Sequence, residues 1–151
     1  MIEKVSEDVF SELLGILCIL QSEVVQTAEY TLPLSGHFIQ NRDSMINWCP
    51  IGRNANSKQR ERFVELDNKY KIRQKYFDVL STYMKTNKLD IIVKLGGNTS
   101  FDIYPIGWDK TYALTHFEEN EWDFWFVGDR CSFGGNDYEI FVSDKTESYS
   151  V

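Results

Sequence analysis

The chain has 151 residues, of which 42% are hydrophobic, 15% aromatic and 26% charged, as in folded globular proteins and unlike disordered or low-complexity chains. A net charge of −7 argues against nucleic-acid or anionic-membrane partners, because phosphate groups favour clustered Lys and Arg. The three cysteines contain no CxxC pair, which argues against a disulfide framework and a zinc site. With no basic signal start and no apolar run of membrane-spanning length, we expect a protein of the reducing cytoplasm.

The first elements expected in the chain are a helix and a β-hairpin. Apolar residues recur at helical spacing over residues 6–25, and Ser6 followed by two acidic residues is typical of a helix start. Residues 37–42 and 45–49 are short, mostly apolar or aromatic segments separated by two polar residues. This pattern predicts two antiparallel strands joined by a tight turn.

A second helix and a second hairpin follow. One apolar face runs from Ser57, the expected cap, to Thr86, and predicts a single long helix. Segments 89–94 and 99–104 flank a glycine-containing turn and predict two further strands. The order helix, hairpin, helix, hairpin indicates an α+β fold, in which two helices cover one face of an antiparallel sheet over about residues 5–105.

The pattern changes at Pro105-Ile106-Gly107, where we expect a domain boundary. Beyond it, residues 109–117 are expected to be helical, and the segments 124–127 and 138–142 are expected to be strands. The first of these strands is followed by Asp129, so it would present a carboxylate at its C-terminal end. These last 45 or so residues are too few for a whole α/β domain.

Arg42, Arg53 and Arg60 fall at a strand end, in a loop and at a helix start. Three guanidinium groups converging from three elements would clamp a phosphate through bidentate hydrogen bonds. The alternative is that they are ordinary solvated side chains, and residue chemistry alone favours that alternative because surface charges are common.

Other polar residues have equally simple alternatives. Strand alternation places Ser100 and Asp102 on one face, where they would meet a sugar hydroxyl or face solvent. Lys110 would neutralise a phosphoryl group, although an exposed lysine needs no such role.

The segment GDRCSFGGNDYEIF combines an acid at a strand end with a glycine-rich loop. Asp129, Asn136 and Asp137 supply the hard oxygen atoms that Mg²⁺ prefers. The same residues would also suit a plain turn in which Asp129 caps the backbone, and the two interpretations stay open at this point.

Residues 36–63, GHFIQNRDSMINWCPIGRNANSKQRERF, are followed in order by LDNKYKIRQKYF, GGNTSFDIYPIGWDK and GDRCSFGGNDYEIF. This series resembles the eukaryotic-type phosphomannomutases of the haloacid dehalogenase superfamily. The resemblance implies a substrate-binding, dimer-forming cap over residues 1–106, which would make the protein a homodimer. It implies part of an α/β catalytic core over residues 107–151.

The resemblance also implies roles for individual residues. Arg42, Arg53, Arg60, Ser100 and Asp102 match family positions that bind the substrate. Lys110 matches the lysine that steadies the phosphoaspartate, Asp129 matches a carboxylate of the Mg²⁺ site, and Asn136 and Asp137 match its supporting loop. Family enzymes interconvert mannose 6-phosphate and mannose 1-phosphate, which feeds GDP-mannose biosynthesis. The three arginines matched in order reverse the simple expectation that they are only solvated.

Two of the departures from the family pattern concern the nucleophile and a peripheral metal site. No segment of these 151 residues resembles DVDGT, the family motif that carries the aspartyl nucleophile. We therefore expect the chain to bind a sugar phosphate without turning it over, either as a segment of a working enzyme or as a non-catalytic binding or dimerisation module. A degenerate remnant with a purely structural role is the third possibility. At a peripheral metal site Phe141 and Thr146 match, but the aspartate between them is shifted to Asp144.

Overall fold

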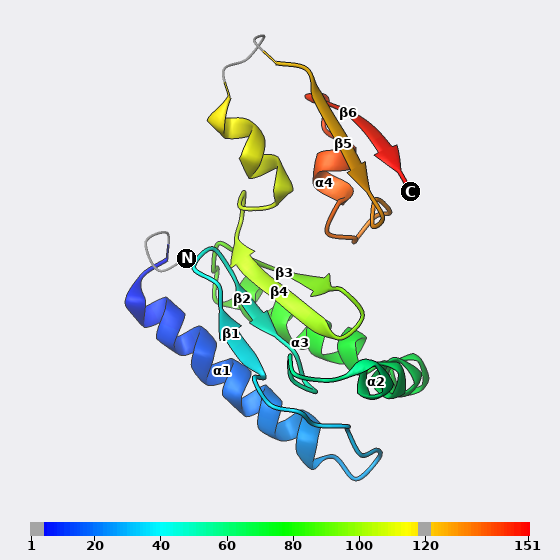
Figure 1. Ribbon diagram of the computed structural model, residues 1–151. Helices are drawn as coiled ribbons and strands as arrows, with labels where there is room; N and C mark the ends of the chain where they lie inside the picture. Colours follow the sequence, from blue (N-terminus) through cyan, green and yellow to red (C-terminus); the bar gives the residue numbers. More distant parts are fainter. Residues whose placement is uncertain (1–4, 118–121) are drawn as a thin grey trace. The chain divides into compact units, whose positions relative to one another are not determined.

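The computed structural model describes residues 5–117 and 122–151, and its elements fall into two units that divide between Pro105 and Ile106 (Figure 1). The first unit contains α1 (Glu7–Gln26), β1 (Ile39–Asn41), β2 (Ile46–Trp48), α2 (Ser57–Tyr70), α3 (Ile72–Thr86), β3 (Ile91–Gly96) and β4 (Ser100–Pro105). The second contains the 3-10 helix η1 (Lys110–His116), β5 (Phe124–Gly128), α4 (Tyr138–Phe141) and β6 (Thr146–Ser150).

The first unit is built on a four-stranded antiparallel sheet in the order β1-β2-β4-β3. Both predicted hairpins are present in it. Alternation along β2 and β4 turns Trp48 and Phe101 toward α1 and α3, whose apolar residues lie in the same buried cluster. The predicted α+β fold, with helices covering one face of an antiparallel sheet, is thereby confirmed.

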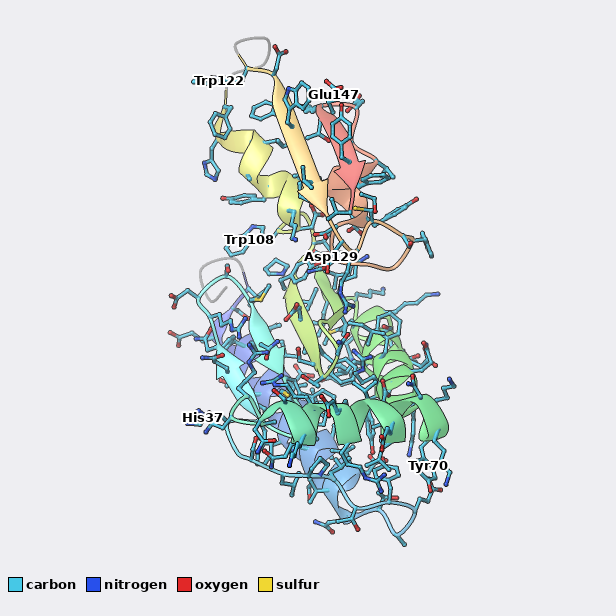
Figure 2. The ribbon with its side chains drawn as sticks, turned by 45° about the vertical axis from the view of Figure 1, so that its right-hand side comes forward. His37, Tyr70, Trp108, Trp122, Asp129 and Glu147 are labelled. Atoms are coloured by element: carbon cyan, nitrogen blue, oxygen red, sulfur yellow. The ribbon has the colours of Figure 1, made fainter. Side chains whose placement is uncertain are left out.

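The long helix expected over residues 57–86 is wrong, because the chain breaks at Lys71. Lys71 has φ 54°, in the left-handed region, so α2 ends at Tyr70, which is labelled in Figure 2, and α3 begins at Ile72. The Asp67 backbone carbonyl accepts the Lys71 N–H at 2.8 Å, and its carboxylate accepts the Arg73 N–H and Nε, each at 2.7 Å. One side chain on α2 therefore satisfies a free N–H group at the start of α3.

The cap of α2 lies one residue before the expected Ser57. The Asn56 side chain accepts the Gln59 N–H at 3.0 Å, and the Gln59 side chain accepts the Asn56 N–H at the same distance. This reciprocal pair is a capping box, which satisfies two backbone donors that a helix start leaves free.

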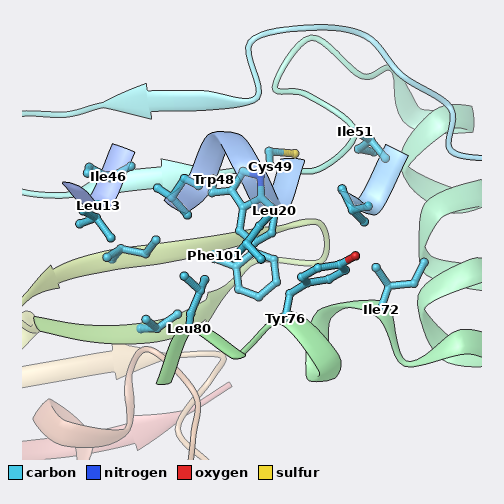
Figure 3. Close-up of a cluster of buried hydrophobic side chains, with 14 of the residues drawn as sticks. Leu13, Leu20, Ile46, Trp48, Cys49, Ile51, Ile72, Tyr76, Leu80 and Phe101 are labelled. Atoms are coloured by element: carbon cyan, nitrogen blue, oxygen red, sulfur yellow. The ribbon is translucent and has the colours of Figure 1, made fainter. Parts of the chain in front are cut away.

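The core of the first unit is organised around Trp48, which has no exposed surface (Figure 3). Its ring stacks on Phe101 with centroids 4.7 Å apart and meets the edge of Tyr76 at 5.7 Å. Its indole N–H donates to Gln21 Oε1 at 2.7 Å, so the buried donor is satisfied. Burying these rings supplies much of the hydrophobic free energy of the unit and ties β2 to α1 and α3.

The second unit contains a parallel pair, β5 and β6. Residues 109–117 are helical as expected, although as a 3-10 helix, and β5 is confirmed. The strand predicted over 138–142 is wrong, because these residues form α4, and β6 was not predicted. The Phe141 N–H donates to the Asp137 carbonyl and closes one helical turn. The prediction failed because a short apolar run is equally compatible with a helix and with a strand. Among the described residues, no helix is long and apolar enough to cross a membrane.

Candidate functional site

A row of polar side chains crosses the sheet face that is turned away from α1 and α3. Gln40 of β1 pairs with Asn47 of β2, Asn47 pairs with Asp102 of β4, and Asp102 pairs with Lys94 of β3. Residues in direct register lie on the same face at adjacent strand positions, so these four side chains form one line. The predicted residue Asp102 thus lies in the middle of a polar surface.

Arg42 follows β1 at the edge of this sheet, and its side chain is exposed. Its Nε donates to Gln40 Oε1 at 3.0 Å, which connects the guanidinium to the polar row. Because Gln40 is neutral, this contact orients Arg42 without neutralising its charge.

Arg53 and Arg60 are brought together by a hydrogen bond from Arg60 Nη2 to the Arg53 carbonyl at 2.9 Å. Arg60 also donates through Nε to the Ala55 carbonyl at 2.9 Å and through Nη1 to Thr99 Oγ1 at 3.1 Å. One guanidinium therefore holds the loop before α2 and the turn between β3 and β4 in a fixed relation.

The loop that carries Arg53 passes very close to a second loop. A Cβ built on Gly52, which has φ 90°, would lie 1.9 Å from the Gly36 carbonyl oxygen. No other residue fits that approach. The path of the backbone next to Arg53 thus depends on a single glycine.

The three predicted arginines differ from other arginines of the same unit in their charge balance. Arg62 pairs with Glu65 at 3.1 Å and Arg73 with Asp67 at 2.7 Å. Among the ion pairs of the described residues, none involves Arg42, Arg53 or Arg60. In a protein of net charge −7, the guanidinium groups of Arg42 and Arg60 donate to neutral oxygens, an arrangement that favours an anion.

The two predicted residues of β4 have different surroundings. Ser100 is buried, and its hydroxyl donates to the Gly96 carbonyl at 2.8 Å. Asp102 is half-buried, and its Oδ1 accepts the Asn47 side-chain N–H at 2.7 Å. Asp102 therefore keeps oxygen lone pairs for a further donor, whereas the Ser100 hydrogen is already used.

A shallow hollow lies beside α2 and the turn between β3 and β4. Its lining residues are Arg60, Glu61, Val64, Glu65, Asn98 and Thr99. Two carboxylates make this hollow a poor phosphate site, because a like charge disfavours an anion. Arg42 and Asp102 do not line it.

In the second unit, Lys110 and Asp137 form an ion pair. The Asp137 side chain is only 3% exposed, and its Oδ2 accepts the Arg130 N–H at 3.1 Å. Burial alone would raise the pKa of Asp137, but the Lys110 ammonium and the Arg130 N–H together hold this pKa below its ordinary value. Asp137 is thus a charged residue that fixes both Lys110 and the loop after β5.

Asp129 and Asn136 have free oxygen atoms in the same loop. Asp129 is exposed just after β5 (Figure 2), and Asn136 Oδ1 is buried without a hydrogen-bond partner. One carboxylate and one orphaned amide oxygen suit part of a Mg²⁺ shell, most of which is often water. Asp137 is already paired with Lys110, so it supports the loop and is not free to bind a metal. Within residues 5–117 and 122–151, no three His, Cys, Asp or Glu side chains cluster as metal ligands.

The residues of the expected peripheral metal site lie in α4 and at the start of β6. Thr146 Oγ1 donates to the Ile140 carbonyl at 2.6 Å, and Phe141 is in α4 itself. Asp144 is exposed between them. The Thr146 hydroxyl is thus used in joining α4 to β6.

A family model for eukaryotic phosphomannomutase matches residues 3–151. The chain belongs to this family. The phosphomannomutase of Schizosaccharomyces pombe is 45% identical over 126 residues, which cover 82% of this chain and 48% of that protein. Those of Saccharomyces cerevisiae and Oryza sativa subsp. indica are 43% and 42% identical, over 77% and 82% of this chain and 45% and 49% of their own. This phosphomannomutase-family chain therefore spans about half the length of the curated relatives it matches.

Sequence reasoning missed the residues that support the predicted site. Gln40 contacts Arg42, and Asn47 contacts Asp102. Gln40 and Asn47 both lie on strands, so the alternation of side chains could have placed them on the same face. The register that joins them comes from pairing between β2 and β4, which are 50 or more residues apart in the chain. A single sequence carries little signal for such long-range pairing.

Proposed function

We propose that these 151 residues supply the substrate-binding part, and some of the phosphoryl-facing groups, of a phosphomannomutase that interconverts mannose 6-phosphate and mannose 1-phosphate. The observation that carries the proposal is the charge balance of Arg42, Arg53 and Arg60 within an acidic protein. None of them takes part in an ion pair among the described residues, and the guanidinium groups of Arg42 and Arg60 donate to neutral oxygens. Family membership makes a hexose phosphate the substrate class that fits them.

The roles follow from the chemistry of the groups. The guanidinium of Arg42 is exposed and charged, so it would bind phosphate oxygens directly. Arg53 would bind beside it, while Arg60 shapes the loop that presents Arg53 and would add its positive charge. Ser100 and Asp102 would face the sugar, with Asp102 accepting a hydroxyl hydrogen.

The second unit would act on the phosphoryl group. Lys110, held by Asp137, would stabilise charge that develops during phosphoryl transfer. Asp129 and Asn136 would hold Mg²⁺, which supplies further charge stabilisation when bound. The aspartyl nucleophile would come from outside these 151 residues, since none of their segments resembles DVDGT.

The proposal extends to the state of the protein. We infer a cytoplasmic homodimer that forms through residues 1–106, the cap of the family architecture, with residues 107–151 belonging to its catalytic core. The alternative is a module that binds sugar phosphate or dimerises without catalysis, which is favoured by the location of the arginines in the first unit alone.

Calorimetric titration of mannose 1-phosphate into the chain tests the proposal. Wild type should bind, and Arg42→Ala and Arg53→Ala should each lower the affinity about tenfold or more, because each removes a charge-assisted hydrogen bond. Arg62→Ala, which removes the same charge from an exposed ion pair on α2, should have little effect. An absence of binding by wild type, or equal losses in all three variants, would overturn the proposal.

A further inference from the structure

Neighbouring residues on the sheet hold the Asp102 carboxylate in place from two sides. On one side, Asn47 Nδ2 donates to Asp102 Oδ1 at 2.7 Å and to the Phe101 carbonyl at 3.2 Å. The Asn47 residue is 1% exposed. Two acceptors and burial together leave its amide a single orientation, so the carboxylate that it contacts is fixed as well.

The other side of the carboxylate is bounded by Gly96 on β3. A Cβ built on Gly96 would lie 2.6 Å from Asp102 Oδ2, 2.8 Å from Cγ and 2.9 Å from Oδ1. Real Cβ atoms do not approach oxygen so closely, so any side chain at this position would push the carboxylate out of place. Gly96 precedes the turn and lies two residues beyond Lys94, the register partner of Asp102.

We propose that Asn47 and Gly96 are positioning residues, which hold the Asp102 carboxylate as an acceptor for a sugar hydroxyl and so favour a hexose phosphate over free phosphate. The inference rests on the proposed function, because Asp102 can accept a hydrogen bond from a sugar hydroxyl only if the arginines bind the phosphate of the same molecule. A carboxylate that is already oriented loses little conformational entropy on binding, so its hydrogen bond contributes more to affinity.

The test compares two probes, mannose 1-phosphate and inorganic phosphate, titrated into the full chain. Asn47→Leu keeps the approximate size of the side chain but removes the amide donor, and it adds no charge. Gly96→Ala displaces Asp102 from the opposite side. Each variant should lose about tenfold in affinity for mannose 1-phosphate, the value of one charge-assisted hydrogen bond, and should keep wild-type affinity for inorganic phosphate.

Matched controls separate positioning from general damage. Gly15→Ala in α1 adds a Cβ with nothing within 4 Å, and Asn68→Leu changes an exposed residue of α2 in the same way as Asn47→Leu. Both should bind the two probes as wild type does. Far-ultraviolet circular dichroism and thermal unfolding of every variant confirm that it is folded.

The outcomes are distinct. If wild type binds mannose 1-phosphate and both variants bind it equally well, the inference is wrong and the proposed function stands. If both probes lose affinity together, the role is merely structural and the inference is again wrong. If wild type binds neither probe, the proposed function is wrong, and so is the inference that rests on it.

Discussion

Arg60 shows how much of the candidate site depends on one side chain. Its guanidinium donates to the Ala55 carbonyl, the Arg53 carbonyl and Thr99 Oγ1. Only a planar, forked donor group can reach three acceptors on two separate loops. Its position at the start of α2 follows from the sequence, whereas its acceptors do not, because two of them are backbone oxygens whose directions depend on the loop conformation.

We expect Arg60→Lys to lower the free energy of unfolding by about 1–3 kcal/mol, because a single ammonium leaves buried acceptors unsatisfied. Urea unfolding measures the change. Arg62→Lys is the matched control two positions along the same helix, where the ion pair with Glu65 has side chains 60% and 68% exposed. It should change stability by less than about 0.5 kcal/mol, and equal losses in the two variants would contradict the role of Arg60.

Asp137 gives the second unit a predictable dependence on pH. Its pKa is lower in the folded state than in the unfolded chain, so its pair with Lys110 is fully stabilising above the unfolded pKa of about 3.9. That contribution is lost as the pH falls through the folded pKa. Hydrogen–deuterium exchange of residues 122–151 should therefore quicken on acidification below about pH 4 more steeply in wild type than in Asp137→Asn, after correction for intrinsic rates.

The exposed Asp144→Asn variant is the control for this measurement, and it should follow the wild-type profile. An Asp137→Asn profile that matches wild type at every pH would show that the ion pair does not govern the acid response.

At the scale of elements, the break between α2 and α3 is a feature that the sequence conceals. Apolar residues continue at helical spacing through the break, and the residue at the break is a lysine, not a glycine or proline that would indicate a helix end. The break is stabilised by Asp67 and Arg73, whose side chains are 11% and 16% exposed. Interactions between the two helices thus overcame the preference of a lysine for a continuous helix.

Substitution at Lys71 tests the strain at this break. We expect Lys71→Gly to raise the free energy of unfolding by about 0.5–1 kcal/mol and Lys71→Val to lower it by about 1–2 kcal/mol, since φ 54° suits glycine and penalises a branched side chain. Thermal unfolding gives both values. Lys69→Gly, in the last turn of α2, should be destabilising by up to about 1 kcal/mol; a gain there would contradict the explanation.

The other elements show what sequence patterns can and cannot predict. The helix α1 and both hairpins could be predicted because their apolar periodicity is long or their turns are well marked. Four-residue α4 could not, because its apolar run is too short to separate helix from strand. The arginines fall on the elements predicted for them, but their neutral partners follow from strand register and loop path, which require the folded chain.

At the scale of the whole molecule, the two units differ in how well they cover their apolar residues. The first buries a continuous cluster beneath its sheet. The second has a two-stranded parallel pair on which Trp125 is 68% exposed and Val127 is 61% exposed. Parallel strands are usually covered on both faces, so this pair lacks the usual source of its stability.

Hydrogen–deuterium exchange should reveal this difference. We expect amides beyond Gly107 to exchange faster than those of β2, β3 and β4, because local opening costs less where fewer apolar contacts are lost. Mass spectrometry of peptic fragments measures both regions in one sample. Uniform protection along the chain would contradict the division between Pro105 and Ile106.

The isolated chain should not turn over either hexose phosphate. Its 151 residues contain no DVDGT-like segment to supply an aspartyl nucleophile, and a phosphoaspartyl intermediate cannot form without that residue. A coupled assay with mannose 1-phosphate and Mg²⁺ checks this, with the Schizosaccharomyces pombe phosphomannomutase as the active control. Conversion by the pure chain that depends on Mg²⁺ would overturn the expectation.

The buried position of Trp48 also means that intrinsic tryptophan fluorescence can follow the unfolding of the protein. Of the four tryptophans, Trp48 alone belongs to the first unit, and it has no exposed surface, whereas Trp122 is 60% exposed and Trp125 is 68% exposed. An indole shielded from water emits at shorter wavelength than a hydrated one. Loss of the blue edge of the emission spectrum should therefore report mainly the melting of the first unit, because Trp108 of the second unit is only half-buried. The measurement needs no label and no engineered substitution.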